Sequence, residues 1–212
     1  MAKCVIFCAA EFDSLAESLE KEDLIIAADG GVRHLQTLGI APDVILGDFD
    51  SLGYIPEGAN VFPVEKDDTD AMLAIRHGLK LGFRQFVIYG GTGGSRIDHT
   101  VANFQALQHL AEQGARGYLV GKDHLVTVAK EETVVFSPSA EGILSVFCIG
   151  RDAEGVTLEG LKYPLTDGTL TSSFPLGASN HFTGQTASVT VEKGCLLLFW
   201  DRKNGFPQRI FL

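Results

Sequence analysis

Acidic and glycine-rich segments recur in the first hundred residues, and each directly follows a short apolar run. They read Asp29-Gly30-Gly31, Asp48-Phe49-Asp50-Ser51, Lys66-Asp67-Asp68-Thr69-Asp70 and Gly90-Gly91-Thr92-Gly93-Gly94-Ser95-Arg96-Ile97-Asp98-His99. Seven of the 27 carboxylates lie in these four segments. Like charges so concentrated repel one another unless cations neutralise them. The pattern therefore indicates a site for a hard metal ion such as Mg²⁺.

The pair Asp48 and Asp50 is two residues apart, so on an extended segment both carboxylates point to one side, as ligands of a shared metal ion must. A solvated turn is the alternative, because Asp and Ser are common turn residues. Asp70 falls in the first turn of an expected helix, where a carboxylate also serves as a cap or stabilises the helix dipole. Each residue alone leaves the choice open, but the loops together favour metal binding.

The segment from Gly90 to Asp98 is rich enough in glycine for backbone N–H groups to approach phosphates, and Arg96 is placed to bind a phosphate with two hydrogen bonds. The segment lacks the GK[ST] ending of a P-loop and the GxGxxG spacing of a dinucleotide site. A tight turn is the alternative for the glycines, and an N-cap is the alternative for Asp98. His99 is expected to be structural.

Short apolar runs alternate with helix-like periodicity up to about residue 120, which predicts an α/β N-terminal domain with a mostly parallel sheet. The expected strands are residues 3–8, 24–28, 44–47, 61–64, 85–89 and 117–120, and the expected helices are 14–20, 30–38, 68–81 and 98–113. In an open parallel sheet the carboxyl ends of the strands form the ligand-binding edge. The four polar segments are thus expected at one edge.

The alternation of strand-like and helix-like segments ends at about residue 122. Short β-rich runs follow at residues 126–128, 133–136, 143–147, 155–159, 187–191 and 195–200, separated by turn residues. This pattern predicts an all-β antiparallel sandwich or barrel-like C-terminal domain. We therefore expect two domains, residues 1–123 and 124–212.

Composition limits the partners. The 212 residues carry 27 acidic and 17 basic side chains, for a net charge of −10, which argues against nucleic acid and anionic membranes as partners. No apolar run reaches the roughly 18 residues of a membrane span, and we recognise no signal peptide. The four cysteines form no CxxC pair and lie among apolar residues, as expected of reduced thiols in a cytoplasmic protein. From the residues alone, a Mg²⁺-dependent nucleotide or phosphate enzyme is expected, with its acceptor open.

With these motifs in order, and with Gly177-Ala178-Ser179-Asn180-His181-Phe182 downstream, the chain resembles the thiamine pyrophosphokinases over nearly its whole length. The resemblance implies transfer of a pyrophosphoryl group from ATP to the hydroxyl of thiamine. It implies Asp48, Asp50 and Asp70 as Mg²⁺ ligands, and Arg96 and Asp98 as further catalytic residues. The ATP-binding residues it implies are Asp29, Gly30, Gly31, Asp67, Thr69, Gly90, Gly91, Gly93 and Arg96.

The same resemblance implies that thiamine is contacted by Ser179, Asn180 and Phe182, with the Phe182 ring stacking on the cationic ligand. It also implies a homodimer with the site at the subunit interface. Read without the resemblance, Ser-Asn-His-Phe is an ordinary turn. Two alternatives remain: a related pyrophosphokinase acting on a pterin alcohol, and a non-catalytic nucleotide-binding protein.

Overall fold

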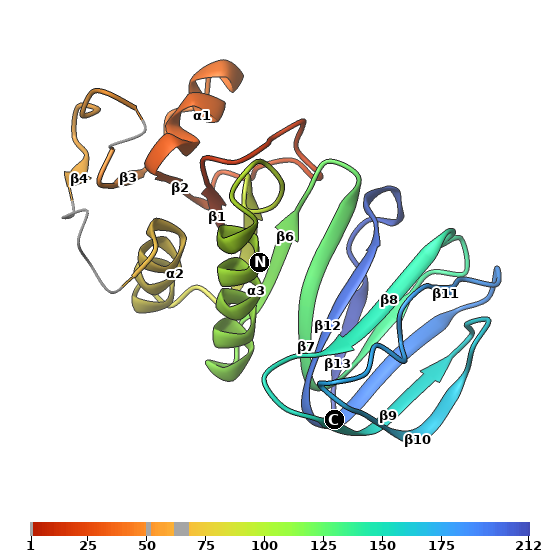
Figure 1. Cartoon of the computed structure of the whole chain (residues 1–212). Coiled ribbons are helices and arrows are strands. Elements are labelled where there is room, and N and C mark those ends of the chain that lie inside the picture. The colour runs from red at the N-terminus through yellow and green to blue at the C-terminus, as the bar shows by residue number, and fades with distance from the viewer. Residues whose placement is uncertain (1, 50–51, 62–67) are drawn as a thin grey trace. The chain divides into compact units, whose positions relative to one another are not determined.

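The computed structural model describes residues 2–49, 52–61 and 68–212. The chain divides into two compact units, Met1–Lys122 and Asp123–Leu212. Figure 1 shows an α/β arrangement in the first and only strands and loops, apart from a short 3-10 turn, in the second. The predicted fold class, α/β followed by antiparallel β, is confirmed.

The first unit is built on a parallel sheet with strand order β6-β5-β1-β2-β3-β4. The strands are β1 Cys4–Phe7, β2 Leu24–Ala28, β3 Val44–Gly47, β4 Asn60–Val61, β5 Gln85–Tyr89 and β6 Arg116–Val120. β1 lies in the middle and is buried along its whole length, as expected of a parallel strand covered on both faces. Chain order reverses between β1 and β5, so the crevice at their carboxyl ends is the topological switch point where such sheets bind ligands.

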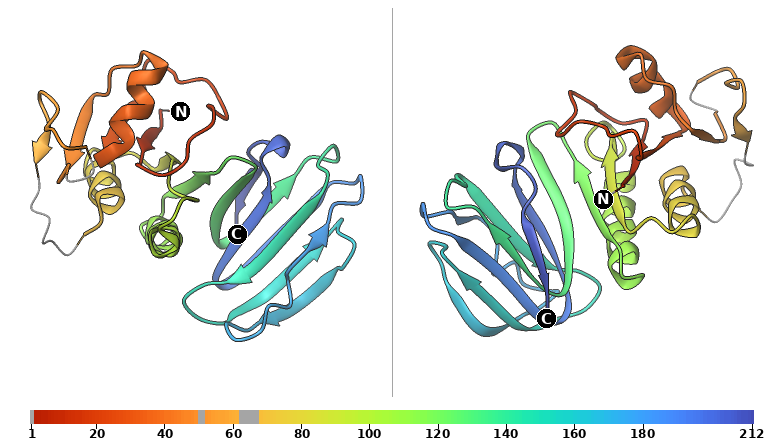
Figure 2. Two further views of the ribbon diagram at one scale, coloured as in Figure 1. Left: turned by 45° about the horizontal axis from the view of Figure 1, so that its top comes forward. Right: turned by 180° about the vertical axis from the view of Figure 1, so that it is seen from behind.

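Three α-helices cover this sheet: α1 Val32–Leu38, α2 Asp70–Lys80 and α3 Ile97–Glu112. α2 and α3 contact each other on one face, and α1 lies on the other (Figures 1 and 2). α2 begins two residues after the predicted start at residue 68, because the Thr69 hydroxyl accepts the Met72 amide at 3.2 Å as an N-cap. A short 3-10 turn, η1 Asp29–Gly31, leads from β2 into α1.

The helix expected at residues 14–20 is wrong: this stretch is irregular. Side chains satisfy its backbone instead, since the Tyr89 hydroxyl accepts the Ala16 amide at 3.1 Å and Asp23 accepts the Glu20 amide at 3.0 Å. Seven residues are also too few for a helix to persist without packing along one face. Of the strand expected at 61–64, Val61 belongs to β4 and residues 62–64 lie outside the described residues.

The second unit is antiparallel throughout, with β7 His124–Phe136 and β12 Ala187–Asp201 as its long central pair. The other strands are β8 Ile143–Cys148, β9 Ala153–Glu159, β10 Leu165–Leu170, β11 Asn180–His181 and β13 Gln208–Phe211, and a 3-10 turn, η2 Arg202–Asn204, precedes β13. The first half of β12 pairs with β9 and its second half with β8, with a register shift between Val191 and Cys195. β12 thus passes from one sheet layer to the other at this irregularity.

β7 and β12 each join two runs that the sequence predicted as separate strands, and β10, β11 and β13 were not predicted.

A buried ion pair holds β13 to β7. The Arg209 guanidinium contacts Glu132 and also donates to Thr127 Oγ1 at 2.8 Å and to the Val128 carbonyl at 2.6 Å. The arginine and glutamate side chains are 2% and 3% exposed, and these added hydrogen bonds are what a buried pair needs to offset desolvation.

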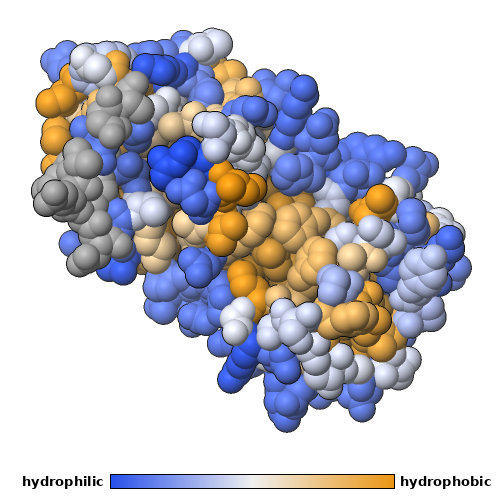
Figure 3. Space-filling view, in the orientation of Figure 1, coloured by the Kyte–Doolittle hydropathy of each residue, from blue (hydrophilic) through white to orange (hydrophobic). Residues whose placement is uncertain are grey.

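Apolar side chains also reach the surface in both units, among them Ile97 and Val101 of α3 and Phe174 and Leu176 before β11. Figure 3 shows hydrophobic residues gathered in patches on the face in view rather than scattered singly. No helix within the described ranges is long and apolar enough to cross a bilayer.

We predict that Gly31→Ala destabilises the first unit by about 2 kcal/mol or more, because a Cβ there meets the Phe7 carbonyl oxygen at 1.8 Å. The matched control is Gly39→Ala, where a Cβ meets nothing within 4 Å and only the left-handed φ of 67° is unfavourable, at about 1 kcal/mol. Urea unfolding followed by circular dichroism measures both. Equal transition midpoints for the two variants would contradict the close backbone approach.

Candidate active site

A pocket of about 1060 Å³ opens at the carboxyl edge of the parallel sheet, wholly within the first unit. It is formed by the segments that follow β1, β2, β3, β5 and β6 and by the first turns of α2 and α3. The volume lies at the upper end of the usual range for small-molecule sites. Its place at the switch point is where ligands are expected in this class of sheet.

The pocket brings together eight residues singled out from the sequence: Asp29, Asp48, Thr69, Asp70, Gly90, Gly91, Gly93 and Arg96. Three others do not line it, namely Gly30, Gly31 and Asp98. Asp50 and Asp67 lie outside the described residues. Convergence of the segments after β2, β3 and β5 and at the start of α2 is thus a feature of the structure, while the role of each residue stays a prediction.

Carboxylates are prominent in the lining of the pocket. Asp29, Asp48 and Asp70 are all half-buried and line it. Their field reaches Cys8, whose pKa rises to about 12, first because the thiol is buried and then because Asp70 and Asp29 oppose a negative charge there. Within residues 2–49, 52–61 and 68–212, no three acidic, histidine or cysteine side chains are arranged as a metal site.

The backbone beside Asp48 differs from the expectation. Phe49 is buried and has a φ of 58°, so the segment turns there and is not extended. The premise that this segment is extended at residue 49 is therefore wrong, while the placing of Asp48 and Asp50 on one side stays a prediction because Asp50 lies outside the described residues. Left-handed φ values at a bulky residue persist only where the surroundings impose them, and such strain is common near functional sites.

The glycine-rich segment after β5 is held by hydrogen bonds at its base. The Asn103 side chain of α3, which is buried, donates to the Gly91 carbonyl at 2.7 Å. The Gly90 carbonyl accepts the Ala10 amide at 3.0 Å. Further along, Gly93 and Gly94 adopt φ values of 83° and 73°. Consecutive glycines in this conformation can turn their N–H groups toward an anion.

Arg96 and Asp98 form an exposed ion pair at the entrance to α3. Arg96 Nε donates to both carboxylate oxygens at 3.0 and 3.2 Å, and its Nη2 donates to Oδ2 at 2.7 Å. The hydrogen bonds from Arg96 lower the pKa of Asp98 to about 2. Asp98 is not the N-cap of α3, which is Arg96 without a side-chain cap bond. The Arg96 guanidinium, which was expected to bind phosphate, is thus already hydrogen-bonded to the Asp98 carboxylate.

Sequence reasoning missed the segment directly after β1. Cys8 to Asp13 line the pocket, as do His34, His99 and Asn103. The Phe12 ring packs against His34 at 5.2 Å and against Tyr89 at 5.7 Å between centroids, giving the pocket an apolar wall. The signal was available, because β1 is itself a parallel strand and its carboxyl end lies at the same edge. It was overlooked because residues 9–12 contain no glycine and only one acid.

In the second unit, the three residues expected to contact thiamine have different surroundings. Ser179 is exposed, and its amide donates to Ser145 Oγ at 3.0 Å. The buried Asn180 accepts the Tyr163 amide at 2.9 Å and donates to the Tyr163 carbonyl at 2.7 Å. The half-buried Phe182 ring packs on Phe136 at 5.2 Å. Asn180 therefore holds a neighbouring loop, while Ser179 is the most accessible of the three.

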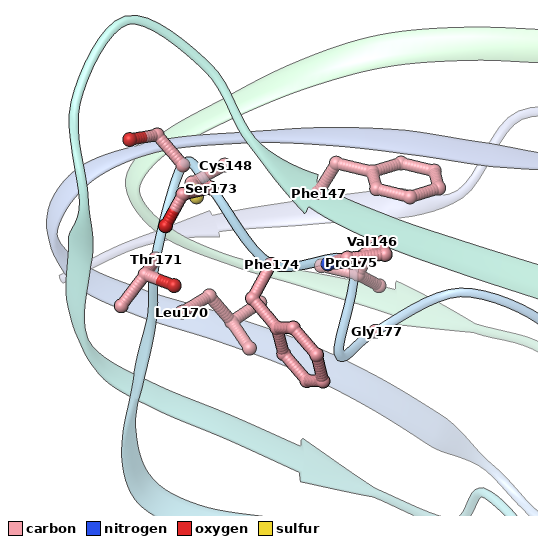
Figure 4. A pocket seen from close by; sticks show the side chains of 10 residues that line it. Val146, Phe147, Cys148, Leu170, Thr171, Ser173, Phe174, Pro175 and Gly177 are labelled. Atoms are coloured by element: carbon pink, nitrogen blue, oxygen red, sulfur yellow. The ribbon is translucent and has the colours of Figure 1, made fainter.

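A smaller hollow of about 160 Å³ lies beside this segment. Figure 4 shows its lining, which comes from residues 146–148 of β8 and from residues 170–175 and 177. The Val146 amide donates to the Gly177 carbonyl at 2.9 Å, which fixes the end of that loop against β8. No charged side chain lines this hollow within the described residues.

Comparisons with known proteins agree with this architecture. Residues 15–119 match the family model described as the thiamin pyrophosphokinase catalytic domain, and residues 123–196 match the vitamin B1 binding domain of that enzyme. The chain is 29% identical to thiamine pyrophosphokinase from Bacillus subtilis strain 168 over 188 residues, covering 84% of this chain and 87% of that protein.

Solved structures share the fold across nearly the whole chain. The crystal structure of thiamine pyrophosphokinase from Bacillus subtilis has a TM-score of 0.82 at 23% identity, covering 95% of this chain and 99% of that one. The enzyme from Geobacillus thermodenitrificans has a TM-score of 0.79 at 24% identity, covering 95% and 97%. The yeast enzyme has a TM-score of 0.73 at 16% identity, covering 96% and 87%.

The chain contains an α/β unit with a polar switch-point pocket, followed in the sequence by a β unit, and two domain models of one kinase match them. These findings define the class of this protein as a transferase of the kinase type. Within that class the chain belongs to the thiamin pyrophosphokinase family. The resemblance seen in the sequence motifs is thereby confirmed.

The ion pair at the entrance to α3 gives a prediction about pH. The Asp98 carboxyl should titrate near pH 2 in the native protein, and Arg96→Gln should return its pKa toward the ordinary value of 3.8, because the guanidinium hydrogen bonds are its main cause. The pair is therefore intact at neutral pH and is lost only as pH falls toward 2. Carboxyl-detected NMR titration measures both values, and a wild-type midpoint near 3.8 would contradict the pair.

Proposed function

We propose that this chain catalyses transfer of a pyrophosphoryl group from ATP to the hydroxyl group of thiamine, giving thiamine diphosphate and AMP. The observation that carries the proposal is the convergence of carboxylates and a glycine-rich segment in one switch-point pocket, in a member of this family. Such parts bind and orient phosphates rather than form a covalent intermediate, which suits phosphoryl transfer.

The residues fit a Mg²⁺ ion. Asp48 and Asp70 supply carboxylate oxygens in the same pocket, the ligands that this hard cation prefers, and Asp50 is proposed as the third ligand from the sequence. Asp29 and Asp70 both raise the pKa of the Cys8 thiol, after burial as the larger cause, which supports a negative potential in this part of the pocket. Bound Mg²⁺ would neutralise charge on the triphosphate.

In the proposed reaction the thiamine hydroxyl oxygen attacks the β-phosphorus of ATP. The bond from that phosphorus to the oxygen bridging the α- and β-phosphates breaks, and AMP leaves with that oxygen. The backbone around Gly93 and Gly94 binds phosphate oxygens, and Arg96 stabilises the developing charge. Asp98, with a pKa of about 2, is a poor proton acceptor, which leaves Asp70 to receive the hydroxyl proton. The loose transition state needs no strong base, so a carboxylate that also holds Mg²⁺ suffices.

We propose that the second unit recognises thiamine through Ser179 and through the aromatic group around Phe182, with Asn180 fixing the Tyr163 loop beside them. We also propose a homodimer with the site at the subunit interface. Exposed apolar side chains such as Phe174 and Leu176 support a buried contact with a second copy. All four cysteines are free, which supports a cytoplasmic location.

Removing one proposed metal ligand should abolish turnover without unfolding the protein. Asp48→Asn is expected to lower kcat by about a hundredfold or more, the scale of losing one electrostatic contact in the transition state. The matched control is Asp167→Asn, which removes an exposed carboxylate of β10 and should leave kcat within about twofold. Unchanged turnover in Asp48→Asn would refute this ligand assignment, and Asp50→Asn should behave like Asp48→Asn.

The nature of the product tests the reaction itself. Incubation with ATP, Mg²⁺ and thiamine should release AMP in a thiamine-dependent way, and chromatography should show equal amounts of thiamine diphosphate. Excess EDTA should stop the reaction and abolish tight ATP binding at neutral pH, because the acidic pocket then repels the triphosphate. Release of ADP would contradict pyrophosphoryl transfer, and a pterin alcohol in place of thiamine should yield no AMP.

A further inference from the structure

The main pocket is poor in positive charge for a site that takes a triphosphate. Its described lining contains six carboxylates, from Glu11, Asp13, Asp29, Asp48, Asp68 and Asp70. Against them stand the two permanently basic side chains of that lining, Arg96 and Lys122. A metal ion offsets only part of this excess, so any protein cation beside the bound phosphates has a large effect on affinity.

These two cations are in different states. Arg96 is engaged by Asp98 through three hydrogen bonds, so its charge is largely compensated and a phosphate must compete for it. Lys122 is exposed, and across residues 2–49, 52–61 and 68–212 no carboxylate lies in an ion pair with it. Its ammonium group is at the end of a long exposed side chain, where an anion can approach it.

The position of Lys122 follows from the sheet. β6 runs parallel to β5, with Tyr89 paired to Val120 at their carboxyl ends. Gly91 is two residues after Tyr89, and Lys122 is two residues after Val120. Lys122 therefore follows β6 at the same level of the sheet at which the glycine-rich segment follows β5. Gly91 itself packs on β6, since a Cβ on Gly91 would lie 2.7 Å from Leu119 Cδ2.

We propose that Lys122 is a phosphate-binding residue that contacts the polyphosphate of the nucleotide held by the glycine-rich segment. The inference rests on the proposed function. A lysine next to a glycine-rich phosphate loop acts as a point charge, while the backbone N–H groups give direction. Lys122 can therefore bind a phosphate without first breaking an ion pair, whereas Arg96 must exchange the Asp98 carboxylate for the phosphate.

Calorimetry with a non-hydrolysable ATP analogue and Mg²⁺ tests the proposal on four proteins: wild type, Lys122→Met, Lys122→Arg and Lys80→Met. Lys122→Met keeps a side chain of similar length without charge and should raise the Kd about tenfold or more, as expected for a lost charge-assisted hydrogen bond. Lys122→Arg should stay within about threefold. The control Lys80→Met removes an exposed lysine at the end of α2 and should stay within about twofold.

Steady-state kinetics separates phosphate binding from a structural effect. In Lys122→Met the KM for ATP should rise about tenfold or more, while the KM for thiamine stays within about twofold. A loss in Lys122→Met that Lys122→Arg does not restore, or an equal rise in both KM values, would overturn the proposal. So would an unchanged analogue Kd in Lys122→Met when the wild type binds well. If the wild type binds no nucleotide at all, the proposed function fails together with this inference.

Discussion

Backbone packing at the carboxyl end of β1 is the constraint on which the rest of the first unit depends. A Cβ at Gly31 would lie 1.8 Å from the Phe7 carbonyl oxygen, and one at Gly90 would lie 2.3 Å from that of Cys8. The segments that follow β2 and β5 therefore cross the end of the central strand at distances open only to glycine. Because the segments after β2 and β5 both pack against the end of β1, their polar residues lie in one crevice.

The same packing sets the electrostatics of the pocket. β1 and its neighbours form an apolar floor that excludes water, so charges above it interact more strongly than they would in solution. The effect is visible at Cys8, a buried thiol at the end of β1 whose pKa of about 12 reflects burial and the charges of Asp70 and Asp29. Neither carboxylate comes from the segment of Cys8. Strands distant in sequence thus act on one another across the sheet edge.

Features that depend on short-range patterns were predictable from the sequence, and features that depend on packing were not. The strand and helix periods predicted the α/β sheet and the two long helices α2 and α3, because those signals lie within a few residues. The left-handed turn at Phe49 and the buried ion pair of Arg209 with Glu132 depend on packing or on neighbours distant in sequence. In the second unit, short β-rich runs predicted the class, but the length of β7 and β12 depends on pairing with each other along their whole course.

A glycine-rich segment that is read as a phosphate cradle contains glycines kept for two different reasons. At Gly90 and Gly91 a side chain would collide with the Cys8 carbonyl or with Leu119, so packing alone requires glycine there. A Cβ at Gly93 would be 3.4 Å from the Glu11 carboxylate, and one at Gly94 would meet nothing within 4 Å. Packing leaves room at these two, yet both have left-handed φ values. At Gly93 and Gly94 it is the backbone conformation rather than packing that favours glycine, and the space beside these two residues is therefore the part of the motif open to a ligand.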